Sequence, residues 1–452
     1  MVAGVPIFIE IYKVTNNLST SIIITILYEV LVLIGGFLTK IWQKLEGKWT
    51  ERIADYIDTI LQALFSGYRR RYLEYISYHH RFFDVKGLRT QGPYSLDLEK
   101  VFVQLSVDPT PAHQITSNPL QSIPEHLRSG THAIWKYINT NGMENHNLVI
   151  LGAPGSGKTT LLKHIALALA MPAHRRKKIE APQLLPVLLF LRDHANDISA
   201  MPDIKLAKLI RNQFIRRQAP VPPDGWLENQ LDQGACLVMF DGLDEVADLT
   251  IRNSVVKWVE QCMSAYSKNR FVLSSRPHGY KTNPLEKVTV LQVKPFTSTQ
   301  VKQFVYNWYL ANEMMSSQRD DPGVHTDANL GADDLLKRIY NTPTLSELAV
   351  NPLLLTMIAT VHRFRSSLPG RRVELYAEIC EVFLGKHHES HGVTSNLTPA
   401  QKQRVIQPLA YYLMRENTRE IKITNIQPVI ETHLAAVSPD ITCTDFIKDI
   451  RK

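Results

Sequence analysis

The sequence has few cysteines, no internal repeats and no extreme charge. Its four cysteines, at positions 236, 262, 380 and 443, lack the spacing of a zinc site, so we expect reduced thiols in a cytosolic protein. Without repeats, a solenoid array is not expected. Hydrophobic residues at 44% and charged residues at 21% describe a folded chain rather than a disordered one, and 452 residues suffice for two or three domains.

The net charge of +8 comes partly from two basic runs, Arg69–Arg71 and Arg175–Lys178. Such runs can contact nucleic acid or anionic lipid. No aromatic residues are interleaved with them for stacking on bases, so solvated helix ends are the better interpretation. A nucleic acid partner is therefore not indicated.

Residues 152–159 match the phosphate-binding pattern G-x-x-x-x-G-K-[ST] without a mismatch. An apolar strand precedes the match and a helical pattern follows it, which is the context that this motif requires. The glycines let backbone N–H groups point inward at phosphate oxygens, the lysine reaches the β- and γ-phosphates, and the threonine hydroxyl takes one position on Mg²⁺. We expect a nucleoside triphosphate to bind at Gly152, Ala153, Pro154, Gly155, Ser156, Gly157, Lys158, Thr159 and Thr160.

A second buried strand, near 236–240, is followed at once by Asp241. Ligands bind at the carboxyl ends of strands in open α/β sheets, so this carboxylate is placed to hold Mg²⁺ together with Thr159. Asp244 and Glu245 follow within one short turn. Either could orient or deprotonate an attacking water, and we expect a catalytic role for both.

A third strand, 270–275, ends just before Arg276. An arginine at that point could reach the γ-phosphate and report whether it is present, so Arg276 joins the candidate catalytic residues.

Taken together, these motifs resemble the NACHT family of signalling NTPases, of bacterial type, within the STAND class, over about residues 86–452. Asn351–Leu355 and 368–376 add to the likeness. The resemblance implies that Pro352 lies against the nucleotide. It implies ATP and Mg²⁺ as cofactors, with GTP left open although no Asn-Lys-x-Asp motif is present. It also implies slow hydrolysis, self-association, an unidentified sensor or effector protein, and a role in signalling or defence.

Five segments follow one another along the chain. We expect a helical region over 1–85, an extended lead-in over 86–130 with an alternating run at 96–105, and an α/β NTPase core over 131–300. The core strands are expected near 148–151, 185–191, 236–240, 270–275 and 289–293, in a parallel sheet flanked by helices. A helical subdomain over 301–395, with a loose loop at 316–334, and the start of an incomplete winged-helix subdomain over 396–452 complete the predicted fold.

Residues 22–42 form a strongly apolar segment that is long enough to cross a bilayer. Basic residues follow it, which would place the NTPase in the cytoplasm. Glu29 near its centre argues against a span, because a buried carboxylate costs about 2.5–3.5 kcal/mol on insertion scales. We expect membrane association of a cytoplasmic NTPase, with a soluble apolar helix as the alternative.

Two other functions fit the motifs. An AAA-like remodelling ATPase would show turnover stimulated by a polymer substrate. A membrane-tethered nucleotide-binding scaffold would show no turnover. The nucleotide-driven switch is the preferred hypothesis, because neither a pore loop nor a second arginine motif is recognisable.

Overall fold

The computed structural model describes residues 11, 18–42, 67–83, 96–109, 133–139, 147–246, 248–365, 368–369, 371–389, 397–416 and 423–451. The chain divides into two compact units, one formed by residues 1–68 with 223–226 and the other by the remainder. The predicted lead-in over 86–130 is described only at 96–109, so most of it lies outside the described residues.

The larger unit is built around a six-stranded sheet with the order β1-β6-β2-β5-β4-β3. Five strands are parallel, and β1 pairs antiparallel with β6 at one edge. The strands are β1 (Val107–Pro109), β2 (Leu148–Leu151), β3 (Leu185–Phe190), β4 (Cys236–Asp241), β5 (Arg270–Ser275) and β6 (Thr289–Val293). The five predicted core strands are therefore confirmed, and only the short β1 was not predicted.

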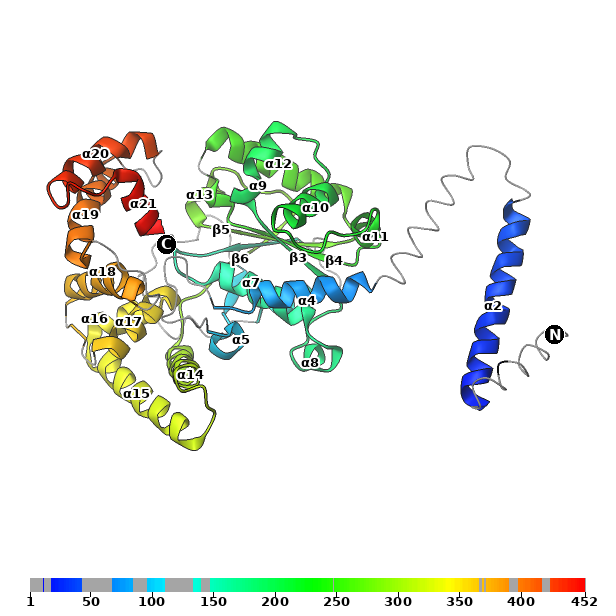
Figure 1. Cartoon of the computed structure of the whole chain (residues 1–452), viewed down its shortest axis with the longest axis horizontal. Coiled ribbons are helices and arrows are strands. Elements are labelled where there is room, and N and C mark those ends of the chain that lie inside the picture. The colour runs from blue at the N-terminus through cyan, green and yellow to red at the C-terminus, as the bar shows by residue number, and fades with distance from the viewer. Residues whose placement is uncertain are drawn as a thin grey trace. The chain divides into compact units, whose positions relative to one another are not determined.

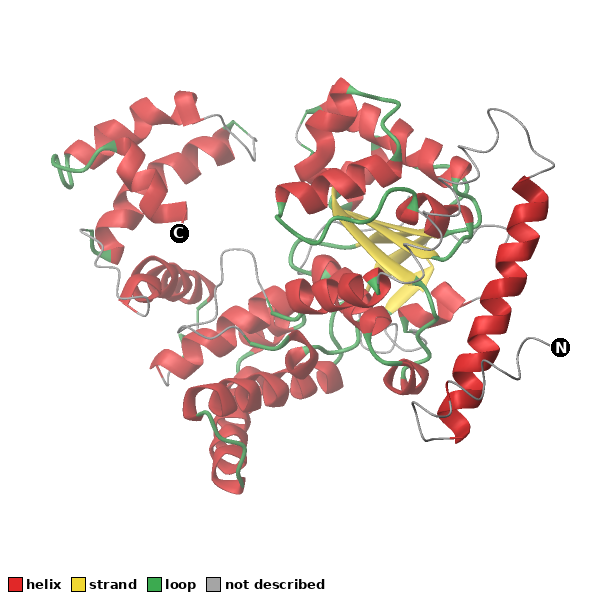
Figure 2. Ribbon diagram, turned by 45° about the vertical axis from the view of Figure 1, so that its right-hand side comes forward, coloured by secondary structure: helices red, strands yellow, loops and turns green. Residues whose placement is uncertain are grey.

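Continuous apolar runs make these strands, because helices cover the sheet on both faces. The helix α7 lies on one face, and α9 and α12 lie on the other (Figures 1 and 2). All six residues of β4 are buried, and Phe240 packs its ring against Trp258 of α12. The helices of this part are α4 (Tyr68–His80), α5 (Leu98–Val101), α6 (Ile134–Asn139), α7 (Lys158–Ala170), α8 (Ala173–Lys178), α9 (Leu191–Ala200), α10 (Leu206–Arg216), α11 (Trp226–Asp232), the 3₁₀ turn η3 (Leu243–Glu245), α12 (Leu249–Ala265) and α13 (Pro277–Lys281).

The run at 96–105 is not uniformly extended as predicted. Asp97 accepts a hydrogen bond from the amide of Glu99 and so begins the single helical turn α5. Phe102, directly after α5, has an extended backbone, and no helix or strand is assigned between it and β1. The N-cap hydrogen bond of Asp97 favours a helical turn here, although the alternating sequence pattern is typical of a strand.

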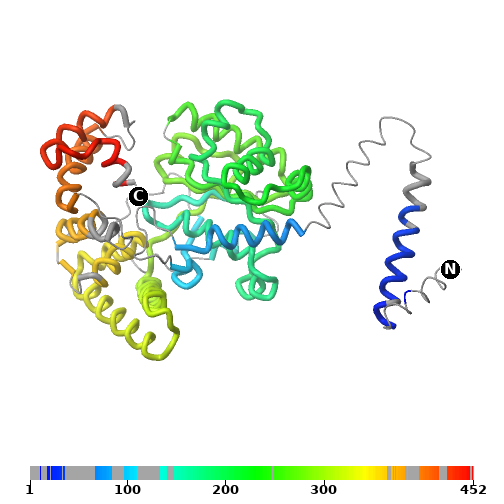
Figure 3. The backbone as a smooth tube through the Cα atoms, in the orientation of Figure 1, coloured from blue at the N-terminus to red at the C-terminus, as the bar shows by residue number. Residues whose placement is uncertain are grey.

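A group of helices follows β6, drawn in yellow-green to orange in Figure 3. They are α14 (Ser298–Ser317), α15 (Pro322–Asn341), α16 (Pro343–Ala349), α17 (Pro352–Arg365) and α18 (Arg372–Glu389). The predicted loop at 316–334 is wrong. Asp321 caps a helix with proline in its first turn, and the buried residues that follow have helical spacing: Val324, Ala328, Ala332, Leu335, Leu336 and Ile339.

The last described residues form three helices, α19 (Pro399–Arg415), α20 (Ile423–Ala435) and α21 (Cys443–Arg451). They enclose a small core of their own that includes Val405, Ile430, Leu434 and Phe446. A winged-helix identity for this part stays a prediction.

The smaller unit contains the helix α2 (Leu18–Trp42), which holds the predicted membrane segment 22–42. Its described side chains include many exposed apolar residues, among them Ile23, Leu27 and Leu31. Within the described residues, however, no helix has the length and apolar character needed to cross a membrane. The structure therefore does not support the predicted membrane span.

Candidate functional site

The phosphate loop joins β2 to α7 as the motif predicts. The backbone is left-handed at Gly155 and Gly157, with φ of 76° and 86°, conformations that other residues rarely adopt. Gly157 directly precedes α7, so the first amides of that helix face the loop. The hydroxyl of Ser156 is buried and has no hydrogen-bond partner within the described residues. A phosphate oxygen would supply the partner that this hydroxyl lacks.

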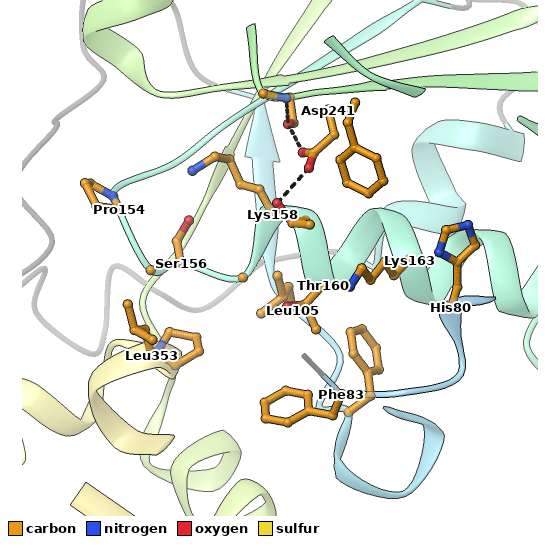
Figure 4. A pocket seen from close by; sticks show the side chains of 18 of the residues that line it. His80, Phe83, Leu105, Pro154, Ser156, Lys158, Thr160, Lys163, Asp241 and Leu353 are labelled. Atoms are coloured by element: carbon orange, nitrogen blue, oxygen red, sulfur yellow. Dashed lines mark hydrogen bonds between the residues drawn. The ribbon is translucent and has the colours of Figure 1, made fainter. Parts of the chain in front are cut away.

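Lys158 folds back over the loop (Figure 4). Its ammonium donates to the carbonyl oxygens of Gly152 and Ala153 at 2.8 and 3.2 Å. Burial lowers the pKa of Lys158 to about 8, an effect that Asp244 opposes and Arg276 reinforces. A phosphate group at the loop would restore the full charge of this lysine.

Thr159 and Asp241, the predicted magnesium ligands, are in direct contact. The threonine hydroxyl donates to Oδ2 of Asp241 at 2.8 Å, and Ser274 of β5 donates to Oδ1. Asp241 is 2% exposed. Hard oxygen atoms at this spacing suit Mg²⁺, which binds through one or two carboxylates plus substrate phosphates. These residues therefore fit the ion that the motif implies.

The two candidate water-activating carboxylates are each held by an arginine. Asp244 pairs with Arg276, at 2.9 Å from its Nε, and also accepts from the Arg276 amide at 2.8 Å. Glu245 pairs with Arg192 at 3.2 Å. The structure thus brings all three predicted catalytic residues together, and it adds Arg192. Arg192 comes just after β3, and so lies at the same edge of the sheet as the other site residues. This position after a predicted strand is the sequence feature that could have identified it.

Pro352 and its neighbours reach the phosphate loop from the helical subdomain. The side-chain amide of Asn351 donates to the carbonyl of Pro154 at 3.0 Å, and the amide of Leu353 donates to Gly155 at 3.2 Å. A Cβ atom at Gly155 would lie 2.7 Å from that of Leu353. The phosphate loop and the start of α17 are therefore packed together.

A cavity of about 470 Å³ joins these residues. Its size is that of a small-molecule site. The phosphate loop, Asp241, Arg276 and Pro352 line one part of it. A further group of lining residues, which were not predicted individually, comes from the N-terminal part of the chain: His79, His80, Phe83, Val101, Phe102, Val103 and Leu105.

Residues 146–312 match the NACHT domain. A search of curated proteins gives no match.

The solved structures that resemble this chain include the following three, all at low sequence identity. They are Drosophila ORC bound to DNA (12% identity, TM-score 0.32, covering 68% of this chain and 80% of the other), the replication initiator DnaA bound to AMPPCP and single-stranded DNA (10%, 0.26, 71% and 82%), and a DNA replication initiation factor (11%, 0.27, 67% and 92%). The phosphate loop, the strand that ends at Asp241 and the strand before Arg276 all fall inside the matched range 146–312. Residues 146–312 of this chain are therefore identified as a NACHT domain.

Proposed function

We propose that this protein is a nucleotide-dependent switch that binds ATP and Mg²⁺, hydrolyses ATP slowly, and passes the nucleotide state to its helical subdomain. The observation that supports this most is the direct hydrogen bonding between the phosphate loop and the start of α17, through Asn351 and Leu353. A ligand that moves the loop must strain or release these contacts, so loop and subdomain change together.

The arginine pairs favour slow hydrolysis. A carboxylate that is bound to a guanidinium is not free to orient a water molecule, so Asp244 and Glu245 must first exchange partners. Arg276 is the residue best placed to respond, because a γ-phosphate would compete with Asp244 for its guanidinium. Binding of the γ-phosphate would then release Asp244 from Arg276, so that this one ion pair couples nucleotide binding to hydrolysis.

The remaining assignments belong to the same proposal. The loop residues 152–160 bind the triphosphate, Thr159 and Asp241 hold Mg²⁺, and Pro352 lies against the nucleotide. The segments 1–85, 86–130, 131–300, 301–395 and 396–452 are the functional divisions of a cytoplasmic protein. Exchange of ADP for ATP exposes surfaces for self-association, and an unidentified sensor or effector connects the switch to signalling or defence.

The test of this proposal is nucleotide binding and its effect on particle size. We expect ATP–Mg²⁺ to bind the purified chain in calorimetry and to increase the particle size in light scattering. Lys158→Ala should lose both responses, whereas Lys257→Ala, which removes an exposed lysine from α12, should keep both. Equal affinities for the wild type and Lys158→Ala would refute the site.

Turnover separates the switch from the other two functions. Slow, unstimulated hydrolysis that Glu245→Gln slows further, with binding retained, supports the switch. A large rise in turnover on adding DNA or an unfolded protein would indicate a remodelling ATPase instead. Tight binding with no turnover at all would indicate a scaffold.

A further inference from the structure

The helix α4 precedes the NACHT domain in the chain and is fixed against its sheet. The hydroxyl of Tyr72 donates to the carbonyl of Pro186 in β3 at 2.8 Å, and its ring stacks on Phe214 of α10 with 5.5 Å between centroids. Tyr75 packs against the same phenylalanine at 4.9 Å. These contacts are buried, so the C-terminal end of α4 has a defined position.

The chain that follows α4 leads to the phosphate loop. Residues 81–83 pair with 96–98 through two backbone hydrogen bonds of 2.7 and 2.6 Å. After α5, the ring of Phe102 stacks on His164 of α7 at 3.6 Å, and Leu105 lies against Gly157. Both ends of this segment therefore contact the domain that binds the phosphates.

His80, the last residue of α4, lines the cavity with an unused hydrogen-bonding capacity. The residue is 5% exposed, and no hydrogen bond to its imidazole occurs within the described part of the chain. Burial, aided by the charges of Lys163 and Arg217, lowers the pKa of His80 to about 3. The ring is therefore neutral at physiological pH and offers one N–H donor and one acceptor. A ligand in the cavity could use this donor or this acceptor.

His80 lies away from the phosphate end of the cavity. In Figure 4 the labelled side chains pass from Ser156 and Lys158 through Thr160 and Lys163 to His80. Lys163 is one helical turn beyond Thr159, about 6 Å along α7. The triphosphate is expected at the loop, so what lies beyond this turn is the nucleoside.

The walls near His80 also suit a nucleoside. Phe83 packs near Phe304, with 6.5 Å between ring centroids, and Phe296 lies 6.2 Å from Phe304. All three line the cavity. Apolar walls with a few polar groups are typical of a site that takes a flat, partly polar ligand.

From these observations we infer that His80 contacts the nucleoside part of the bound nucleotide, so that a helix outside the NACHT domain completes the nucleotide pocket. This inference depends on the proposed nucleotide binding. It makes His80 a binding residue that recognises the ribose or the base, separate from the phosphate-binding residues of the loop.

The experiment compares two ligands by calorimetry, ATP–Mg²⁺ and inorganic tripolyphosphate–Mg²⁺. His80→Leu should weaken ATP binding about five- to tenfold, the value of one hydrogen bond, and leave tripolyphosphate binding unchanged. His80→Gln, which keeps a donor and an acceptor, should recover part of the ATP affinity. Tyr72→Phe loosens α4 without changing the cavity, and it should alter neither affinity.

The outcomes are distinct. If His80→Leu weakens the binding of both ATP and tripolyphosphate, or of neither, the role of His80 is overturned. The proposed nucleotide site would remain in place in both cases. A Tyr72→Phe variant that behaves like His80→Leu would also overturn it, because α4 would then act only as a support. A wild type that binds neither ligand would refute the proposed function, and the inference with it.

Discussion

The affinity for ATP should depend on pH through Lys158 over the range in which the phosphates are fully ionised. The ammonium of this lysine donates to two carbonyl oxygens, and burial brings its pKa to about 8 despite the nearby carboxylates of Asp244, Asp241 and Glu245. When a triphosphate binds, its charge raises the pKa of the lysine again. Below pH 8 the free protein already carries the proton. Above pH 8 it must take up a proton in order to bind, so the affinity falls as the pH rises.

The size of the effect follows from the fraction of charged lysine in the free protein. Between pH 7.5 and pH 9 that fraction falls from most of the molecules to about a tenth, so ATP–Mg²⁺ should bind about eightfold more weakly at pH 9. Calorimetry at both pH values, in buffers of different ionisation enthalpy, gives the affinity and the number of protons taken up.

The control is Lys158→Arg, since a guanidinium stays charged throughout this range. This variant should bind with an affinity that does not change between the two pH values, whatever its absolute strength. A wild-type affinity that is constant from pH 7.5 to 9, with no proton uptake, would show that Lys158 of the free protein stays protonated over this range, and would refute the reasoning.

Three further changes have definite outcomes. Asp241→Asn should remove the magnesium-dependent part of the ATP affinity, measured with Mg²⁺ and with a chelator, and a retained dependence would place the ion elsewhere. Asn269→Ala should lower the free energy of unfolding by about 3 kcal/mol in urea denaturation, because the buried carboxamide binds the amide of Cys236 and two carbonyl groups. Gly155→Ala should speed hydrogen exchange at the amide of Leu353, since the added methyl group has no room, and unchanged exchange would mean that the loop and α17 are not coupled.

The sheet and the order of the site residues along it could be predicted from the sequence. Apolar runs that end in glycine, aspartate or arginine mark buried parallel strands, and the carboxyl ends of such strands meet at one edge. That is why Thr159, Asp241 and Arg276 were predicted to lie near one another. Their partners could not be predicted. Asp244 and Arg276 bind one another, and no local pattern reveals which of several charges at one edge will pair.

The helix α15 and the position of His80 could not be predicted, because both depend on packing between segments that are far apart in the sequence. The helix α15 has small buried residues in a polar sequence, and Gly331 approaches the ring of Tyr309 so closely that a Cβ atom would lie 2.6 Å from it. This signal is invisible without the partner helix. His80 lies more than 70 residues before the phosphate loop, and only the tertiary fold brings it to the cavity.

The strand β1 determines where a stable fragment of this protein can begin. It covers β6, which would otherwise be the sheet edge, and the side chain of Gln300 fastens the preceding segment by donating to the carbonyl of Gln104 at 2.7 Å. A fragment that starts at residue 146 would leave β6 with an open row of amides and carbonyls, a template for aggregation. The smallest soluble fragment is therefore expected to begin before Leu96, well upstream of the recognisable domain.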